Sequence, residues 1–237
     1  MTRSDNADLS VLHVIVPLRG AASGKSRLGL ALDAEERQVL ILGMLASTLD
    51  ALAGWPAAAA VHLVTDEAQT MAVVHRARPG ISLVTEPPDG GLNGALRAAR
   101  DAAVGSGATA ILILPADLPL LSTAALEALL DGADAALAAG EGRPVVAIAS
   151  ADARRGTNAL LLSPPDVIEP QFGDASLEAH LRAAAEAEAS VQLVIDPALG
   201  FDLDTPDDLE RLDLGRLLEL EQLGQRMLQP EPAAEAV

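Results

Sequence analysis

Length, composition and charge exclude several classes of protein. A chain of 237 residues, half of them hydrophobic, can bury the core of one large α/β domain or of two small ones. With a net charge of −18, two Phe, one Trp and no Tyr, its surface repels nucleic acid and anionic membranes and offers few rings on which bases could stack. Because cysteine is absent, disulfides and thiolate metal sites are excluded.

The two ends of the chain carry no apolar targeting segment. The first ten residues are polar, and no apolar run reaches the roughly 20 residues needed to span a bilayer. We therefore expect a cytoplasmic protein. Residues 1–10 are expected to form a flexible N-terminus, residues 11–228 a single domain, and residues 229–237, which are rich in Pro, Ala and Glu, a disordered tail.

Short apolar runs alternate with longer amphipathic stretches, which is the pattern of βα units around a sheet. Several runs are apolar on both faces, as strands covered by helices on each side should be. The sequence therefore predicts an α/β fold whose single domain is a mostly parallel sheet flanked by helices. The predicted strands are Val11–Pro17, Ala60–Thr65, Ile81–Thr85, Thr109–Leu114, Val145–Ala149, Ala159–Leu162 and Val191–Ile195.

Capping residues indicate where the helices begin. Asp33 and Glu36 form a capping-box pattern that predicts a long helix ending near Ala53. Thr205, Pro206 and Asp208 form a second such pattern before the last apolar stretch. The other helices are expected at residues 94–104 after Asn93, from Ser122 to about residue 130, after Asp174 to about residue 188, and from Pro206 to about residue 228 with weak points at Gly215 and Gly224.

A basic loop follows the first predicted strand, at the sheet edge where open parallel sheets bind ligands. Lys25 is the only lysine in the chain, and it lies between Arg19 and Arg27 in a stretch of Gly, Ala and Ser. Three cations among flexible backbone N–H groups could hold a triphosphate and stabilise departing pyrophosphate. The alternative is an ordinary basic surface loop.

A Walker-type phosphate loop does not fit this segment. The glycines of that motif are separated by four residues, whereas Gly20 and Gly24 are separated by three. Its lysine opens a helix at once, but the next capping residue here is Asp33. The fourth predicted strand also lacks an acidic residue directly at its end, since two residues intervene before Asp117.

Acidic residues at two further strand ends or turns are candidate metal ligands. Asp117 follows an apolar strand, and a carboxylate on a rigid strand end suits Mg²⁺; the alternative is a turn-forming Asp beside proline. Asp202 and Asp204 alternate with Leu203, so on an extended segment both point to one face, and helix capping does not account for either. Asp204 is the preferred second ligand because it lies nearer the helix start.

Small polar residues form a third group of candidates. Asn93 follows a glycine turn and could bind a base or ribose, while Thr157 and Ser176 lie in segments that offer hydroxyls and backbone N–H groups to an anion. Taken singly, each segment is better explained as loop and capping chemistry. His180 lies one helical turn after Ser176 and is expected to be structural.

Taken together, these segments resemble the 2-phospho-L-lactate guanylyltransferases of deazaflavin coenzyme F-420 biosynthesis, a family that includes phosphoenolpyruvate and 3-phosphoglycerate guanylyltransferases. The resemblance spans roughly residues 11–209 and rests on six motifs in order. They are Gly24-Lys25-Ser26-Arg27-Leu28, Gly91-Leu92-Asn93-x-Ala95-Leu96, Pro115-Ala116-Asp117-Leu118-Pro119, Gly156-Thr157-Asn158-Ala159-Leu160, Phe172-Gly173-x-x-Ser176-x-x-x-His180 and Asp202-x-Asp204-Thr205-Pro206-x-Asp208.

The resemblance implies a GT-A-like nucleotidyltransferase fold and a role for each motif. Lys25, Arg27 and Asp117 would be catalytic, and Asp117 with Asp204, or with Asp202, would bind Mg²⁺. One departure is Arg19, where the family usually has lysine, which leaves its role open. The implied nucleotide-binding residues are Leu18, Arg19, Gly20, Lys25, Glu86, Asn93 and Ala95, and the implied acceptor-binding residues are Thr157, Asn158, Gly173 and Ser176.

The resemblance also implies the activity, which is transfer of GMP from GTP to 2-phospho-L-lactate, phosphoenolpyruvate or 3-phosphoglycerate with release of pyrophosphate. The acceptor phosphate is already ionised at neutral pH, so no general base is required. Two alternatives remain: a molybdopterin or sugar-phosphate nucleotidyltransferase of the same fold, and a catalytically silent binding module. No nucleic acid or membrane partner is expected, and the C-terminal helix could form a homodimer face.

Overall fold

The computed structural model describes residues 7–18, 25–85, 90–151 and 156–229. Its centre is a seven-stranded sheet in the order β3-β2-β1-β4-β6-β5-β7. The pairs β1–β2, β1–β4, β2–β3 and β5–β7 are parallel, and β6 runs antiparallel to both β4 and β5. The strands are β1 (Leu12–Pro17), β2 (Ala58–Thr65), β3 (Ser82–Thr85), β4 (Ala110–Ile113), β5 (Val145–Ser150), β6 (Thr157–Ser163) and β7 (Ser190–Val194).

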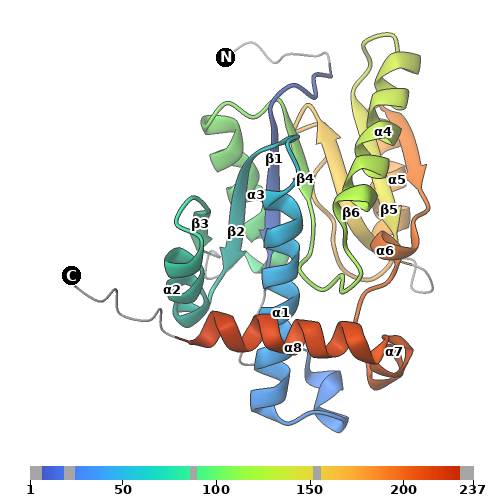
Figure 1. The fold of residues 1–237 in the computed structure, drawn as a ribbon. Coiled ribbons are helices and arrows are strands. Elements are labelled where there is room, and N and C mark those ends of the chain that lie inside the picture. The colour runs from blue at the N-terminus through green and yellow to red at the C-terminus, as the bar shows by residue number, and fades with distance from the viewer. Residues whose placement is uncertain (1–6, 19–24, 86–89, 152–155, 230–237) are drawn as a thin grey trace.

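Helices cover both faces of this sheet, with α1, α4 and α8 on one side (Figure 1). The alternation of side chains along β1 sends Leu12, Val14 and Val16 into the core on that side, whereas Ile15 joins the second core, beneath α3 and α5. In the described ranges, no helix is both long and apolar enough to cross a lipid bilayer. The helices are η1 (Ser26–Leu30), α1 (Ala34–Ala53), α2 (Ala68–Ala77), α3 (Gly91–Gly105), α4 (Thr123–Ala139), α5 (Ser176–Glu186), α6 (Pro197–Gly200), α7 (Pro206–Arg211) and α8 (Leu214–Leu228).

All seven predicted strands are confirmed, with ends that shift by at most a few residues. The prediction of a mostly parallel sheet flanked by helices is also confirmed. Both capping boxes form: the Asp33 side chain accepts from Glu35 N and Glu36 N, and Thr205 pairs reciprocally with Asp208. These contacts are local in sequence, which is why they could be predicted from the residues alone.

Two predicted helix limits are wrong. Asn93 does not cap α3, which begins at Gly91; its amide instead bonds the main chain of Phe172. The helix after Ser122 continues to Ala139 rather than ending near residue 130, because its apolar face packs on β5 and β7. The helix predicted after Asp174 forms and ends at Glu186, close to the expected end, and it is preceded directly by Ala175 in a left-handed conformation (φ 55°).

The predicted long C-terminal helix is in fact two helices. The break falls at Leu212 and Asp213, and the Asp213 side chain caps α8 by accepting from Gly215 N and Arg216 N. Helix α8 then lies across α1 (Figure 1). Gly224 was expected to be a weak point in this helix, but it is a packing residue at the crossing.

Glycine on each helix lets α1 and α8 approach closely. A Cβ added at Gly43 would lie 1.9 Å from the carbonyl oxygen of Leu220, and one added at Gly224 would lie 1.9 Å from that of Val39. Both obstacles are backbone atoms that a side-chain rotation cannot move. The crossing therefore requires glycine at both positions.

Replacing Gly43 with alanine should destabilise the fold by about 2–3 kcal/mol or more, because the helices must separate to accommodate one methyl group. For a domain of this size, that corresponds to a fall in melting temperature of roughly 5–10 °C. Gly105→Ala is the matched control, since a Cβ at this helical glycine meets nothing within 4 Å. It should leave the melting temperature unchanged or slightly raised. Equal melting temperatures for the two variants would contradict the close-approach explanation.

Candidate active site

Two neighbouring strands deliver the first part of the site. Strand β1 ends at Pro17, and Leu18 continues its pairing by donating from its backbone N–H to Val64 O at 2.8 Å. Beside it, β4 is extended by the bond from Leu114 N to Ile15 O at 2.9 Å, and Asp117 follows three residues later. Both segments therefore leave the sheet at the same carboxyl edge, as the sequence predicts.

A distant segment brings the second carboxylate to this edge. Leu203 N donates to the main-chain oxygen of Asp117 at 3.1 Å, which ties the segment preceding α7 to the segment that follows β4. The buried carboxylate of Asp208, part of the α7 capping box, accepts from the backbone N–H groups of Asp204 at 3.1 Å and Thr205 at 2.9 Å. These bonds fix the position of Asp204 beside Asp117.

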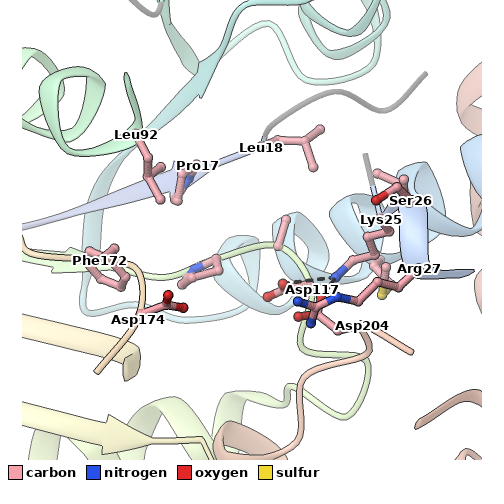
Figure 2. A pocket seen from close by; sticks show the side chains of 14 residues that line it. Pro17, Leu18, Lys25, Ser26, Arg27, Leu92, Asp117, Phe172, Asp174 and Asp204 are labelled. Atoms are coloured by element: carbon pink, nitrogen blue, oxygen red, sulfur yellow. Dashed lines mark hydrogen bonds and ion pairs between the residues drawn. The ribbon is translucent and has the colours of Figure 1, made fainter. Parts of the chain in front are cut away.

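Lys25 joins the two carboxylates. Its Nζ lies 3.1 Å from Asp117 Oδ2 and 2.6 Å from Asp204 Oδ1, and its side chain is 13% exposed (Figure 2). Burial by itself disfavours the ammonium, but the two carboxylates outweigh this effect and raise the pKa of Lys25 above its usual value. Lys25 therefore remains charged at neutral pH. Its backbone is left-handed (φ 51°), an uncommon conformation outside glycine that orients this residue at the start of η1.

These residues open onto a cavity of about 550 Å³, a size typical of small-molecule sites. Both cations and two of the three carboxylates lie at one end, and Leu92, Phe172 and Asp174 lie toward the other (Figure 2). The described lining holds two cations and three carboxylates, so it is not cationic by itself. The lining residues are Pro17, Leu18, Lys25, Ser26, Arg27, Ile41, Met44, Leu92, Pro115, Ala116, Asp117, Phe172, Asp174 and Asp204.

The donor set at the charged end suits a hard divalent cation. Asp117 and Asp204 direct carboxylate oxygens to one point, and their side chains remain 31% and 36% exposed, so substrate can reach them. Within the described residues, no group of three or more acidic or histidine side chains converges on a metal position. A pair of carboxylates with room for phosphate oxygens and water is what Mg²⁺ uses at nucleotide sites. The residues present therefore fit this ion.

Phe172, at the other end of the cavity, is held from two helices. The Asn93 side chain of α3 donates to Phe172 O at 3.0 Å and accepts from Phe172 N at 2.8 Å. His180 of α5, which is fully buried, accepts from Gln171 N at 2.9 Å through Nε2 and stacks edge-on against the Phe172 ring. Because Gln171 N–H can only donate, the neutral imidazole carries its proton on Nδ1 and donates it to Thr157 Oγ1 at 2.9 Å.

The predicted acceptor residues lie close to these contacts around Phe172. The Ser176 hydroxyl, 2% exposed, accepts from Thr157 N at 2.9 Å, and Asn158 Nδ2 donates to Leu199 O and Gly200 O at 2.9 and 3.2 Å. These three side chains are buried and already hydrogen-bonded within the protein. Gly173 differs, because it joins two cavity residues with φ at 130°, a conformation that favours glycine.

The other predicted site residues divide into three groups. Leu18, Arg27 and Asp204 line the cavity, whereas Ala95 is buried in the core beneath α3 and Asp202 is absent from the described lining. Arg19, Gly20 and Glu86 fall outside the described residues. The roles assigned to all of these residues stay predictions.

Several lining residues were not among the predicted site residues, among them Leu92, Phe172 and Asp174. Phe172 carried a usable signal, since it is one of only two phenylalanines in the chain and lies in a quoted motif. The position of Leu92 directly before Asn93 was a weaker signal. No sequence signal marked the apolar lining residues Ile41 and Met44 of α1, because both match ordinary core positions of a long helix.

Buried His180 should make the fold sensitive to mild acid. Burial lowers its pKa from 6.5 to about 4, so between these values the unfolded chain binds a proton that the folded chain does not. The stability conferred by the neutral ring is thus fully present above pH 6.5 and is lost as the pH falls toward 4. Between pH 7 and pH 5, this group should lower the free energy of unfolding by about 2 kcal/mol.

Chemical denaturation at the two pH values measures this loss. His180→Gln removes the titrating ring and should therefore remove most of this loss in the free energy of unfolding between pH 7 and pH 5. His13 and His62, whose pKa values are also lowered by burial, continue to contribute to the pH dependence. An unchanged pH dependence in the variant would contradict the assignment.

Comparison with known proteins places this geometry in a family. Residues 12–215 match the family described as "Guanylyl transferase CofC like". The chain is similar to the phosphoenolpyruvate guanylyltransferase of Rubrobacter xylanophilus, with 41% identity over 202 residues, 85% of this chain and 93% of that protein. It is 36% identical to the 3-phospho-D-glycerate guanylyltransferase of Phenylobacterium zucineum over 199 residues, 83% of this chain and 87% of that one.

Two solved structures show the same fold at low identity. One is a nucleotidyl transferase from Methanothermobacter thermautotroptrophicus, with a TM-score of 0.59, 18% identity, and coverage of 88% of this chain and 98% of that one. The other is a 4-diphosphocytidyl-2C-methyl-D-erythritol synthase, with a TM-score of 0.59, 15% identity, and coverage of 88% and 98%. The predicted nucleotidyltransferase-type fold is therefore confirmed. The chain belongs to the guanylyl transferase CofC-like family.

Proposed function

We propose that this protein is a Mg²⁺-dependent guanylyltransferase that transfers GMP from GTP to a small phosphorylated carboxylic acid and releases pyrophosphate. The candidate acceptors are 2-phospho-L-lactate, phosphoenolpyruvate and 3-phosphoglycerate, and the proposed setting is cytoplasmic coenzyme F-420 biosynthesis. The observation that carries the proposal is the convergence of Lys25, Asp117 and Asp204 at one end of a nucleotide-sized cavity. Family membership and the names of the two relatives support the guanylyl group and the class of acceptor.

The charged end of the cavity accounts for the chemistry. Lys25 and Arg27, both in its lining, would contact the triphosphate and stabilise the charge that develops on pyrophosphate. Asp117 and Asp204 would hold Mg²⁺, which, when bound, neutralises phosphate charge. An ionised phosphate oxygen of the acceptor attacks the α-phosphorus, and the bond from that phosphorus to the oxygen of the leaving pyrophosphate breaks. The protein thus acts by positioning and charge neutralisation, without a general base.

The acceptor segment has a different part in this proposal. Because the side chains of Thr157, Asn158 and Ser176 are buried and bonded within the protein, we assign them to shaping the acceptor side of the cavity. The main chain at Gly173, between two lining residues, is then the group best placed for direct contact. Asn93 likewise acts on the ligand through Phe172 in this proposal.

One competition experiment tests the proposed reaction. The protein is mixed with Mg²⁺, GTP or ATP, and equal amounts of the three acceptors, with a molybdopterin and a sugar phosphate offered in separate reactions, and the products are identified by mass spectrometry. One guanylylated acid together with pyrophosphate is the expected result, with GTP preferred over ATP. Equal rates with both nucleotides would remove the guanylyl assignment. A product formed only with a molybdopterin or a sugar phosphate would show the alternative activity, and no pyrophosphate with any pair would indicate a binding module.

A further inference from the structure

A side-chain cation already occupies the point where the two metal-binding carboxylates converge. Lys25 Nζ lies 2.6 Å from Asp204 Oδ1 and 3.1 Å from Asp117 Oδ2. The left-handed backbone of Lys25 and the bond from Leu28 N to Lys25 O at 2.9 Å place this residue at the start of η1, and its side chain is largely buried. The ammonium is thus part of the built structure at this point of the cavity.

A divalent ion and this ammonium compete for the same oxygens. Mg²⁺ binds carboxylate oxygens at about 2.1 Å, so two cations sharing this pair would lie close together in a partly desolvated cavity and repel each other. The protein also offers little compensation, because no third acidic or histidine side chain joins the pair among the described residues. A free metal ion would therefore have to displace the Lys25 ammonium, and the protein would supply it with only two carboxylates.

A nucleoside triphosphate removes both obstacles together. Its phosphate oxygens give the metal the ligands that the protein lacks, and they give the Lys25 ammonium new acceptors within the same cavity. The charge balance also favours binding of metal and triphosphate together. The described lining carries three carboxylates and two cations, so it would repel a triphosphate without its metal.

Resting on the proposed function, we infer that Lys25 is a placeholder for the metal: it holds the Asp117–Asp204 pair in the free enzyme and moves to the phosphates when the metal–nucleotide complex enters. The ligand that the site takes is then the metal–triphosphate complex, and free metal binds weakly. Metal and nucleotide strengthen each other's binding by the same factor, because coupling between two ligands is reciprocal.

Mn²⁺ binding to the full-length protein tests the inference without an activity assay. Free Mn²⁺ is measured by electron paramagnetic resonance, with and without a GTP analogue carrying a non-hydrolysable α,β-methylene bridge. In the wild type, the analogue should raise Mn²⁺ affinity by about tenfold or more. Lys25→Met, which keeps the length of the side chain and removes its charge, should bind Mn²⁺ about tenfold more tightly than the wild type when no nucleotide is present.

Arg27→Met is the matched control. Arg27 lines the same cavity and carries the same charge, but the structure gives its side chain no ion pair to a described residue. Arg27→Met should change the Mn²⁺ affinity measured without nucleotide by less than about threefold, since it alters only the overall electrostatic potential of the cavity. Lys25→Arg retains a cation and should keep Mn²⁺ binding weak. Asp117→Asn added to Lys25→Met should abolish the gain.

Several outcomes would overturn the placeholder role. They are unchanged Mn²⁺ affinity in Lys25→Met, an equal gain in Arg27→Met, or a gain that survives Asp117→Asn. Melting curves confirm that each variant is folded. If the analogue still raises Mn²⁺ affinity in the wild type while Lys25→Met shows no gain, the inference fails and the proposed metal site stands. If the wild type binds no Mn²⁺ even with the analogue, the placeholder role and the proposed metal site both fail. The guanylyl-transfer assay then shows whether the proposed activity survives without this metal site.

Discussion

Replacing Asp117 with asparagine is expected to lower kcat/KM by about a thousandfold, roughly 4 kcal/mol of transition-state stabilisation, while the protein remains folded. The change removes one of two charges directed at the proposed metal position and keeps the shape of the side chain. The fold should tolerate it because the tie between Asp117 and Leu203 is made by main-chain atoms. Steady-state kinetics at saturating Mg²⁺, with a melting curve for each variant, measure both effects.

Two related variants control this experiment. Asp204→Asn should be about as damaging as Asp117→Asn, since both carboxylates bond the same ammonium and line the cavity. Asp202→Asn should have a smaller effect, because Asp202 is not among the described lining residues. Near-normal turnover in Asp117→Asn at saturating Mg²⁺ would disprove its role. A larger loss from the Asp202 change would reverse the proposed order of the two ligands.

Removing the Lys25 side chain should have the second largest effect. Lys25→Ala is expected to cost about 2–4 kcal/mol in the transition state, comparable to the loss of one preorganised donor elsewhere. Lys25→Arg should restore only part of this, because a planar guanidinium does not replace a point charge in a tight site. The measurements are kcat/KM for both variants and their thermal unfolding.

The alternative for Lys25 is a solvated loop residue, whose loss would be nearly silent. A side chain that is 13% exposed and bonded to two carboxylates is not solvated in this way. Unchanged kinetics in Lys25→Ala would refute the phosphate-binding role. Lost activity together with an unchanged melting temperature would support it, because a purely structural lysine would lower both.

The hydrogen bonds that hold Phe172 show how polar residues of a sequence motif can affect a ligand indirectly, by positioning another residue of the site. Asn93 and Thr157 read in the sequence as ligand-binding residues, since amides and hydroxyls near strand ends commonly bind substrates. In the structure, Asn93 bonds the Phe172 main chain and Thr157 bonds His180, so both stabilise the loop that carries the ring. Each residue type was compatible with either role, and only the position of its partner distinguishes them.

Features that depend on neighbouring residues could be predicted from the amino-acid sequence. The seven strands follow from short apolar runs that alternate with amphipathic stretches, and the helix starts at Asp33 and Thr205 follow from capping boxes closed within three residues. Lys25 and Asp117 were also identifiable singly, because each follows an apolar strand at the sheet edge where ligands bind. Asp204 was identifiable because helix capping does not account for it.

The contacts between distant segments depend on how the elements pack and could not be predicted from the sequence. Lys25 and Asp204 are separated by 179 positions, and their contact depends on the sheet order and on the bond from Leu203 to Asp117. The close crossing at Gly43 is equally invisible in the sequence, where a helical glycine indicates weakness and not contact. The physical reason is the same in both cases: local patterns specify which element forms, whereas packing between elements specifies which side chains share a site.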